Sequence, residues 1–568
     1  MNHQDLSSFI WNICDDVLRG LFKPHEYGDV ILPFVVLRRL DCVLEPKKDQ
    51  VYDLYENLKD KLDDPTPVIL NQVKTTFYNH SKYDLSRLTQ DSQNLNLNFN
   101  NYINGYSENV REIVENFQLE KPVDKLNKSN RLFLLIDKFT EVDLSPEKVD
   151  NHTMGQIFEE LLRRFSEMSN ETSGEHYTPR DVVRLLVSLV FSENREDLEG
   201  EGKIRSIFDP CCGTGGMLTI GKEWIHQNIN SDIDLLLYGQ ELNPQTYSIC
   251  KSDMMITGEN PNNIHMGSSL SEDNHETSNF DYMITNPPFG VSWKSEQELI
   301  KTESTNPNGR FFVGTPRSSD GSLLFLQHMI SKMEDKGSRI GIVFNGSPLF
   351  TGDSGSGESE IRKWIIENDW LECIVSLPDQ LFFNTGISTY IWIVTNNKSD
   401  RRRGKVQLIN GSTFFQPMKK SLGNKRKEIP EEKRGQILDS YLSFEEDKYS
   451  KIYSNEFFGY TKVTIEQPTI KDGKVVTNKQ GDPKPDSSKR DYERVPLEDD
   501  IDGYYDREVK PHLPDSWMDR SKDSVGYEIN FTKYFYEYKP LRSLDEITTD
   551  ILQLEKESEG LFEKIFND

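Results

Sequence analysis

Residues 286–289, Asn-Pro-Pro-Phe, place an amide, two prolines and an aromatic ring directly after a stretch with the period of a strand. Proline lacks a backbone N–H and fixes φ, so Pro287 and Pro288 predict a stiff turn whose carbonyl oxygens are free to accept hydrogen bonds. The Asn286 side-chain oxygen and the Pro287 carbonyl could hold both hydrogens of a planar amine such as adenine N6. They would favour the tetrahedral nitrogen that forms as a methyl group arrives. Phe289 could stack on the base.

A glycine-rich stretch, "IFDPCCGTGGML" at 207–218, lies between a strand pattern and a helical pattern. Its glycines would let the backbone approach a ligand, and the N-terminus of the following helix favours a negative group. The next predicted strand ends at Glu241, where an acid could bind both hydroxyls of a ribose. The spacing G-x-G-G differs from the dinucleotide fingerprint, and no Gly-Lys-Ser/Thr of a phosphate loop follows. The predicted cofactor-binding residues here are Asp209, Gly213, Thr214, Gly215, Gly216 and Glu241.

Each motif alone has a purely structural alternative. The glycines could form a packing turn, and Asn-Pro-Pro-Phe could be a turn without chemistry. A nucleoside-binding loop upstream of an amine-holding turn instead favours methyl transfer to an amine. Two other function classes stay open: a methyltransferase for another planar amine, such as a protein glutamine or a ribosomal RNA base, and a non-catalytic scaffold subunit.

Length and composition describe a soluble globular chain. It has 568 residues, of which 35% are hydrophobic and 28% are charged, and this length predicts two or three domains. No apolar run approaches the ~18 residues of a membrane span, and the start has no basic region typical of a signal peptide. The six cysteines lack the spacing of a disulfide framework or a zinc site, so we expect no metal and a reducing cytoplasm. A formal net charge of −27 argues against nucleic-acid binding by this chain unaided.

The elements that must position these residues change character along the chain. Residues 1–150 have helical periodicity, with a second helix interrupted or started at Pro33 and a polar, Asn-rich connector at 85–107. From residue 203, short β-rich runs alternate with helical stretches, which indicates a doubly wound α/β sheet with ligands at the carboxyl ends of its strands. The strands near 371 and 388 are joined by too few residues for a helical crossover and predict an antiparallel pair at one edge.

Beyond residue 415 the chain becomes charged and irregular. We expect a hairpin turning at Asp472-Gly473, a polar linker over about 478–500, and a final helix that begins near 543. The basic runs at 400–405 and 419–427 are more often solvated loops than DNA contacts, but they stand out in an acidic chain.

The motifs "DPCCGTGG", "QELNPQT" and "TNPPFGVSW" resemble those of S-adenosylmethionine-dependent DNA adenine-N6 methyltransferases. A wider match, including "MGQIFEELLRRFSE", "SGEHYTPRDVVRLLV" and "FFNTGISTYIWIV", is similar to the modification (M) subunit of type I restriction-modification systems. The resemblance implies a Rossmann-like α/β methyltransferase core with an N-terminal helical domain (1–150), a catalytic domain (151–415), a charged extension (416–540) and a C-terminal docking helix (541–568). It also implies S-adenosyl-L-methionine as cofactor and double-stranded DNA with the target adenine flipped out as substrate.

The resemblance further implies partners and residue roles. Two M subunits would pair with one specificity (S) subunit that reads the sequence, and a restriction (R) subunit would join the full complex. Asp209 and the loop glycines would cradle the methionine part of the cofactor, and Glu241 its ribose. Related enzymes often carry an acid where this chain has Ser268, which leaves the contact to the cofactor's adenine open. The segment that would close over the methionine part is Glu175, His176, Tyr177, Thr178, Pro179 and Arg180, with Thr178 as the direct contact and His176 in a packing role.

Two further segments carry predictions. Residues 290–318, directly after the catalytic turn, are long and polar, and we expect a mobile loop that orders over the flipped adenine. In the C-terminal helix, a capping box from Ser543 to Glu546 precedes a coiled-coil seam that is interrupted at Ser558. This seam could pack on its own domain or, as the resemblance implies, dock on the S subunit. Its apolar residues are Leu544, Ile547, Ile551, Leu554, Leu561 and Ile565.

Overall fold

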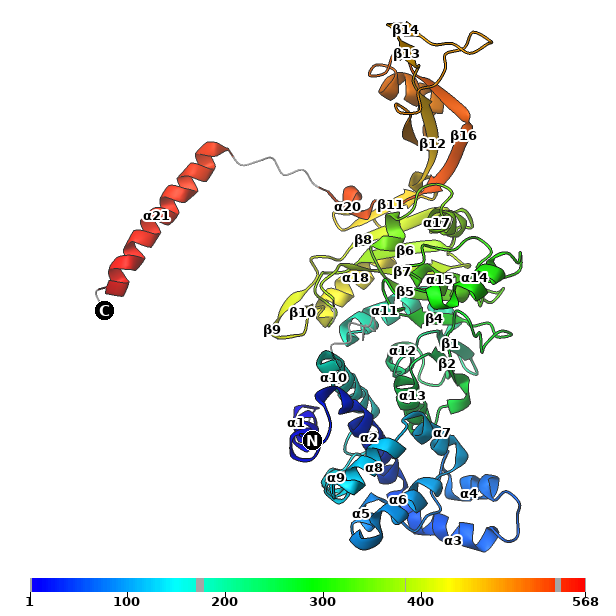
Figure 1. The fold of residues 1–568 in the computed structure, drawn as a ribbon, viewed down its shortest axis with the longest axis vertical. Helices are drawn as coiled ribbons and strands as arrows, with labels where there is room; N and C mark the ends of the chain where they lie inside the picture. The colour runs from blue at the N-terminus through cyan, green and yellow to red at the C-terminus, as the bar shows by residue number, and fades with distance from the viewer. Residues whose placement is uncertain (1–2, 170–177, 384, 537–542, 567–568) are drawn as a thin grey trace. The chain divides into compact units, whose positions relative to one another are not determined.

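The computed structural model describes residues 3–169, 178–383, 385–536 and 543–566 (Figure 1). The chain divides into two units, Met1–Ile529 and Asn530–Asp568, and each is described by itself. The four-region division predicted from the sequence stays a prediction.

The first part of the larger unit is helical, as predicted. Most of its helices share one apolar core, in which most residues of α2 are buried, whereas α3 and α4 form a smaller separate cluster through Val51, Ile69 and Val73. The Asn-rich connector predicted at 85–107 is wrong, because Leu95, Phe99 and Tyr102 recur at helical spacing and are buried in this core. The helices are α1 (His3–Ile13), α2 (Gly28–Leu44), α3 (Lys48–Leu58), α4 (Thr66–Val73), α5 (Leu85–Leu88), α6 (Leu95–Asn104), α7 (Glu108–Asn116), α8 (Glu120–Lys128), α9 (Leu132–Thr140) and α10 (Asn151–Ser169).

Helix α2 begins at Gly28 and runs across Pro33 without a break, so the prediction that it is interrupted or started at Pro33 is wrong. A proline inside a helix removes one backbone hydrogen bond and crowds the preceding turn. Burial of nearly every side chain from Val30 to Leu44 offsets that cost, because each large apolar side chain removed from water contributes about 1.5–3 kcal/mol.

A nine-stranded sheet follows, in the order β11-β8-β6-β7-β5-β4-β1-β2-β3. All neighbours are parallel except around β7 and β11, which run antiparallel to their partners. The order reverses at β1, which pairs with β2 on one side and β4 on the other, and such a switch point opens a ligand crevice at the carboxyl ends of the strands. The strands are β1 (Ile204–Asp209), β2 (Asp234–Glu241), β3 (Ile264–Met266), β4 (Tyr282–Thr285), β5 (Arg339–Asn345), β6 (Leu371–Ser376), β7 (Thr389–Thr395), β8 (Lys405–Asn410) and β11 (Ser450–Ser454).

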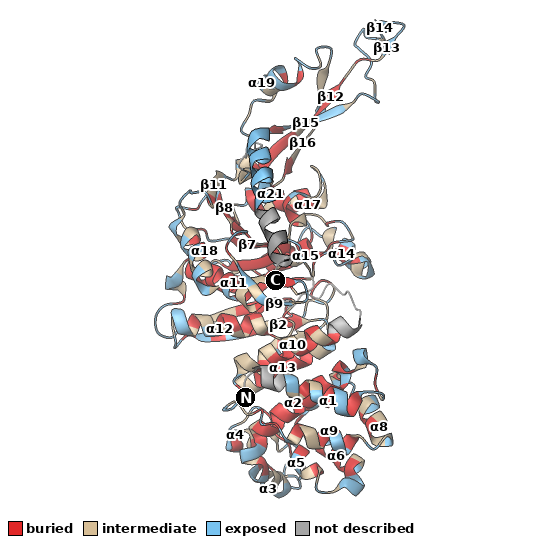
Figure 2. Ribbon diagram, turned by 90° about the vertical axis from the view of Figure 1, so that its left-hand side faces the viewer, coloured by how far each residue is buried: buried red, intermediate tan, exposed pale blue. Residues whose placement is uncertain are grey.

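The antiparallel pairing of β6 and β7 confirms one prediction, but the expected edge position is wrong. Strand β7 lies between β6 and β5 and is buried over nearly its whole length (Figure 2). Strands β8 and β11 extend the sheet beyond β6, so the sheet continues past residue 415.

Helices α11 (Arg180–Ser192), α12 (Gly216–Asn228), α13 (Pro244–Thr257) and α18 (Glu431–Ser443) share a second apolar core with the sheet. On the other face, the ring of Phe208 stacks on Phe280 at 4.4 Å and meets the edge of His328 in α15 (Ser322–Ile330) at 6.0 Å. Helix α13 belongs to both cores: Ile249 and Met255 pack with the helical region, whereas Cys250 and Met254 pack with the sheet.

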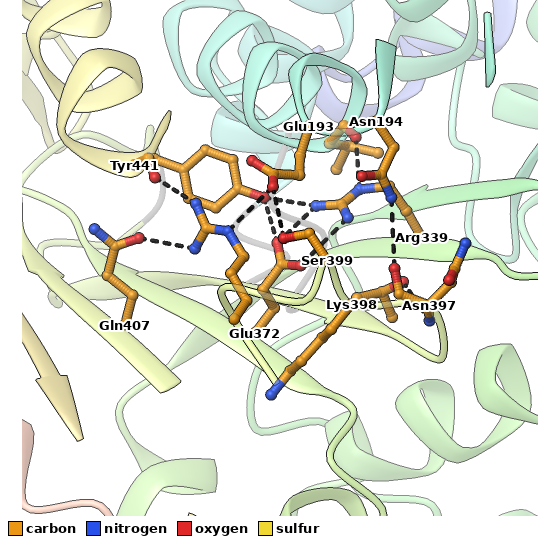
Figure 3. A network of polar contacts seen from close by, with 12 residues as sticks. Glu193, Asn194, Arg339, Glu372, Asn397, Lys398, Ser399, Gln407 and Tyr441 are labelled. Carbon is orange, nitrogen blue, oxygen red and sulfur yellow. Dashed lines mark hydrogen bonds and ion pairs between the residues drawn. The ribbon is translucent and has the colours of Figure 1, made fainter. Parts of the chain in front are cut away.

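A buried polar network joins β5, β6 and α18 (Figure 3). The Arg339 guanidinium pairs with Glu372 at 2.8 Å and donates to the Tyr441 hydroxyl at 2.6 Å, while Tyr441 donates to Glu372. Glu372 has no exposed surface, and the charge of Arg339 overcomes the effect of burial to lower the pKa of this carboxyl to about 2.

The basic run at 400–405 belongs to the same region, and the first two of its three arginines make polar contacts within the protein. Arg401 pairs with Glu193 at 2.8 Å, and Arg402 is fully buried, where it donates to Gln407 and to the carbonyl of Tyr441. Arg402 is therefore a buried structural residue, whereas the Arg401 side chain stays 45% exposed beside its ion pair.

Beyond the sheet, a three-stranded sheet in the order β15-β12-β16 forms from β12 (Gly459–Glu466), β15 (Asp491–Pro496) and β16 (Trp517–Tyr527). The hairpin predicted at Asp472-Gly473 is confirmed as the pair β13 (Ile470–Lys471) and β14 (Lys474–Val475), with φ of 51° and 73° at the two turn residues. The linker expected over 478–500 is wrong in part, because β15 lies within it.

The smaller unit holds α20 (Phe531–Tyr534) and α21 (Leu544–Phe566). The final helix and its capping box are confirmed, since the Ser543 amide donates to Glu546 and the Glu546 amide to the Ser543 hydroxyl. None of the helices in the described part of the chain has the length and apolarity needed to cross a membrane.

Candidate active site

The carboxyl ends of β1, β2 and β4 meet at one cleft, with about 1420 Å³ of empty space including its open mouth. These strand ends carry Asp209, Glu241 and Asn286, so the structure brings together the three motifs predicted from the sequence. Of the predicted residues, the lining includes Thr178, Asp209, Gly213, Thr214, Gly216, Glu241, Asn286 and Pro288.

The glycine loop takes conformations that other residues rarely adopt. Gly213 and Gly215 have φ of 55° and 84°. A Cβ on Gly215 would lie 2.8 Å from the sulfur of Cys250, so the loop packs closely on α13. Gly216 then begins α12, whose first backbone N–H groups have no partner within the helix and favour a negative ligand.

Glu241 is held by backbone amides on both carboxylate oxygens. Gly213 donates to Oε2 and Asn243 donates to Oε1, both at 2.8 Å. A carboxylate has about four acceptor positions, so these two bonds fix the orientation of the side chain and leave capacity for further donors. The bond from Gly213 also ties the end of β2 to the glycine loop.

Asp209 ties β1 to β4 and is almost fully buried. Its Oδ1 accepts from the Thr285 hydroxyl at 2.6 Å and from the Cys211 amide at 3.0 Å. Burial raises the pKa of this carboxyl to about 7. Asp209 therefore aligns the strand ends from inside the protein while it also lines the cleft.

Asn286 and Pro288 line the cleft, and the Asn286 amide nitrogen donates to Thr178 Oγ1 at 2.9 Å. Phe289 occupies a different position from the one expected for base stacking. It is 7% exposed and meets the Phe382 ring at 5.9 Å with an interplanar angle of 73°. In this structure Phe289 braces the turn from the core side.

Of the segment 175–180, Glu175, His176 and Tyr177 lie outside the described residues. Pro179 precedes the first residue of α11, Arg180, which donates to both oxygens of Glu159 at 3.2 and 3.3 Å and contacts Nδ1 of His152 at 2.8 Å. Burial lowers the pKa of His152, and the charge of Arg180 adds to this effect.

Glu159, on α10, also lines the cleft and was missed from the sequence. A Cβ on Gly216 would lie 3.2 Å from its Oε1, so the side chain lies against the start of α12. Glu159 lies within "MGQIFEELLRRFSE", but nothing there singles it out, because it is one acid on an amphipathic helix whose apolar residues supply the helical core.

The segment 290–318, which we expected to be a mobile loop that orders over the flipped adenine, is folded. It contains α14 (Gln297–Ser304), and Trp293, Ile300 and Phe311 form a small core with Leu270 and Leu324. The Trp293 amide donates to the Ser318 carbonyl at 3.2 Å and its indole N–H to the Arg317 carbonyl at 3.0 Å. The apolar anchors are too widely spaced to produce a helical or strand period.

Most lining residues that the sequence did not single out lie within the quoted motifs or a few residues after them. Ser268, whose role was left open, also lies in the lining, and Leu242 beside Glu241 is 68% exposed. Phe325, on α15, lies within "GTPRSSDGSLLFLQHMI", a further stretch that resembles the M subunit but whose residues were assigned no role. The missed lining residues include Glu159, Leu242, Asn243, Thr246, Ser269, Val291, Ser292, Trp293, Glu296 and Phe325.

These residues fit S-adenosylmethionine, the cofactor implied by the motifs. The glycine turns bring the backbone to the cleft, Glu241 is fixed as an acceptor for a ribose diol, and the start of α12 suits a carboxylate. Leu242 supplies an exposed apolar surface beside Glu241 for an adenine ring. No group of three or more His, Cys, Asp or Glu side chains within the described ranges is arranged to hold a metal ion.

Comparisons with known proteins agree with this geometry. The family described as N-6 DNA methylase matches residues 149–464, and the HsdM N-terminal domain matches residues 6–139. The type I restriction enzyme MjaIX methylase subunit of Methanocaldococcus jannaschii is 26% identical over 82% of this chain and 82% of its own length. The HindI methylase subunit of Haemophilus influenzae is 32% identical over 45% of this chain, which spans 54% of that relative.

Among solved structures, the methyltransferase subunit of a type I restriction-modification system from Streptococcus thermophilus has the same fold, with a TM-score of 0.63. It is 22% identical, and the match covers 80% of this chain and 96% of that one.

Proposed function

The chain belongs to the N-6 DNA methylase family, which matches more than half of its residues, and from its site we propose which residues carry methyl transfer to adenine N6. It is the M subunit of a type I restriction-modification system, since the helical region and the catalytic sheet match the two regions of such subunits. The reaction moves a methyl group from S-adenosylmethionine to the exocyclic amine of adenine in double-stranded DNA. The arrangement of Asn286 beside the glycine loop and Glu241 carries this assignment.

The cofactor supplies an electrophilic methyl group when bound, and the chain's own residues orient it. Glu241 accepts from the ribose hydroxyls, and the backbone of the glycine loop from Gly213 to Gly216 cradles the methionine part. The N-terminus of α12 favours its carboxylate. Glu159, the carboxylate that lies against Gly216, faces the region of its ammonium group.

Asn286 and Pro287 act on the base. The Asn286 amide nitrogen donates to the Thr178 hydroxyl, and this bond fixes the orientation of the amide so that its oxygen can accept from the base. That oxygen and the Pro287 carbonyl accept the two hydrogens of N6 and favour the tetrahedral nitrogen, so their stabilisation is greatest in the transition state. The proton released after transfer passes to water. Base extrusion costs a few kcal/mol, which contacts between the extruded base and the cleft lining must offset.

The partner assignments extend this proposal. An S subunit supplies sequence recognition, two M subunits bind one S subunit, and an R subunit joins the complete assembly. A chain of net charge −27 needs a partner that brings DNA to it, because phosphate neutralisation dominates DNA affinity. A cytoplasmic location, where the DNA is, belongs to the same proposal.

The substitution Asn286→Ala tests the catalytic assignment in the reconstituted complex with S. We expect the methylation rate to fall by about 10²–10³, by analogy with the loss of one oxyanion donor. The affinity for S-adenosylhomocysteine, measured by calorimetry, should stay unchanged because Asn286 and the glycine loop end different strands.

Asn345→Ala is the matched control, since Asn345 ends the neighbouring strand β5 and accepts from the Ser347 amide at 2.9 Å. Products are identified by mass spectrometry of digested DNA. N6-methyladenine formed at the normal rate by the Asn286 variant would overturn the catalytic role. Methylated protein or RNA with unmodified DNA would instead support the other planar-amine substrates.

A further inference from the structure

A basic hairpin projects from the larger unit beside α18, formed by β9 (Gln416–Leu422) and β10 (Lys425–Glu428) (Figure 1). It carries five lysines and arginines, and these divide into two groups. Lys425 and Lys427 are engaged in ion pairs within the protein. Lys419, Lys420 and Arg426 are exposed, and no ion pair is present for them in the part of the chain that the structure describes.

The hairpin is anchored to the start of α11, next to the segment predicted to close over the cofactor. The buried ammonium group of Lys425 lies 3.1 Å from both carboxylate oxygens of Asp181. The Ile429 amide, directly after β10, donates to the same carboxylate at 2.8 Å. Asp181 follows Arg180, so this anchor is one residue away from the contact to Glu159 in the cleft.

A second anchor leads to the catalytic turn. The backbone amides of Arg426 and Lys427 both donate to the Gln380 carbonyl, at 3.0 and 3.3 Å, and the Asn424 amide donates to the Phe383 carbonyl at 2.7 Å. Between these two acceptors lies Phe382, whose ring packs on Phe289.

The anchoring side chains and the free charged side chains lie on different residues of the hairpin, which is informative about its role. The structure uses the side chains of Lys425 and Lys427 and four backbone amides, those of Asn424, Arg426, Lys427 and Ile429, to fix the hairpin to both halves of the active site. It leaves Lys419, Lys420 and Arg426 in water. Neighbouring side chains along a strand point to opposite faces, so Lys419 and Lys420 present charge on both sides of the hairpin.

We propose that Lys419, Lys420 and Arg426 bind phosphates of the DNA strand that flank the flipped adenine. The hairpin is anchored to the segment that packs on the catalytic turn, and its exposed basic side chains are free to bind phosphates. This arrangement suits DNA, whose position must be fixed relative to that turn. Phosphate contacts position a protein on DNA without reading its sequence, which matches an M subunit whose partner reads the bases. This inference rests on the proposed action on double-stranded DNA.

The test compares two triple substitutions in the complete M–S complex. The first is Lys419→Gln with Lys420→Gln and Arg426→Gln. The matched control is Lys471→Gln with Lys474→Gln and Lys484→Gln, which removes the same charge from exposed lysines on and around the hairpin of β13 and β14. Affinity for a duplex is measured by fluorescence anisotropy over a range of salt concentrations. The duplex carries the complex's own site, identified by mapping N6-methyladenine in methylated DNA.

We expect the slope of log affinity against log salt to become shallower by about 0.9 for each phosphate that the variant no longer binds, with little change in the control. The ratio of affinities for site-containing and scrambled duplexes should stay constant. An unchanged slope in the first variant would overturn the proposal, as would loss of S from the purified complex, because the hairpin would then bind protein. The readout needs no methyl transfer, so a wild-type complex that binds DNA without methylating it would refute the catalytic proposal alone.

Discussion

The Asn286 side-chain nitrogen donates to the Thr178 hydroxyl at 2.9 Å, which joins the end of β4 to the residues just before α11. This bond fixes which arm of the amide carries the donor. The amide oxygen is therefore already oriented to accept a hydrogen bond before any substrate binds. The amide does not have to reorient during the reaction.

Thr178→Val should therefore slow methylation while leaving the fold intact. Loss of one neutral hydrogen bond costs about 0.5–1.5 kcal/mol, which predicts a fall in kcat of roughly three- to tenfold at saturating cofactor. Thr178→Ser keeps the hydroxyl and should restore most of the rate. Single-turnover methylation of a saturating duplex measures the effect, and equal rates for the Val and Ser variants would refute the orienting role.

The folded segment 290–318 should protect its amides from hydrogen exchange even without DNA. The Trp293 amide donates to the Ser318 carbonyl, and the indole packs in the core with Ile300 and Phe311. Trp293→Ala removes the largest side chain of this core, where such truncations cost about 3–5 kcal/mol, and should raise exchange across the segment. Fast exchange in the DNA-free wild type would favour the mobile loop predicted from the sequence.

Asp209 should make stability depend on pH. Burial raises its pKa to about 7 in the folded protein, against about 3.9 in an unfolded chain. Between these values the folded state binds a proton that the unfolded state has lost, so the unfolding free energy falls as pH rises through this window. Asp209→Asn removes the titrating group. Between pH 5 and pH 8, the unfolding free energy of this variant should therefore fall by about 1–3 kcal/mol less than that of the wild type. Chemical denaturation measures the unfolding free energy of the wild type and of the variant at each pH. Unfolding free energies that change in parallel with pH would contradict the prediction.

The network of Arg339 and Glu372 should dominate the stability of the sheet at its β5–β6 side. Glu372→Gln leaves the buried guanidinium without its counter-charge, and breaking a buried pair costs about 3–5 kcal/mol. Because the folded pKa of Glu372 is lowered to about 2, this contribution is present above its unfolded pKa and is lost as pH falls toward 2. Asp506→Asn, in an exposed pair with Lys510 at 3.1 Å, is the control and should cost about 0–1 kcal/mol. Similar melting curves for both variants would show that the buried pair contributes little.

Helix α21 should be needed for assembly with S but not for cofactor binding. Leu544, Ile551 and Leu554 recur at spacings of seven and three residues along this helix, which suits an apolar face that a partner covers. We expect a chain lacking 543–568 to bind S-adenosylhomocysteine normally, to lose S on co-purification and to lose site-specific methylation. Stoichiometric recovery of S with the truncated chain would place the docking surface elsewhere.

Sequence patterns predicted the residues at the strand ends of the cleft better than the residues that line its walls. Asp209, Glu241 and Asn286 were predictable because each ends a strand, and parallel strand ends meet at one edge. Glu159 and Phe325 were not predictable. They lie on helices, where the periodicity of apolar residues shows which face is buried but not which residues line a cleft. The interior position of β7 depended on β8 and β11 joining the sheet beyond β6, which no local pattern indicates.

Helix α13 contributes to both apolar cores, and this constrains how such subunits can be recombined. A chimera that joins the helical region of one homologue to the catalytic sheet of another would keep α13 with the sheet, because the helix follows β2 in the chain. Ile249 and Met255 would then meet a foreign surface. Exchange between relatives should be tolerated only where those two positions match the new helical region, so the two segments are expected to be inherited together.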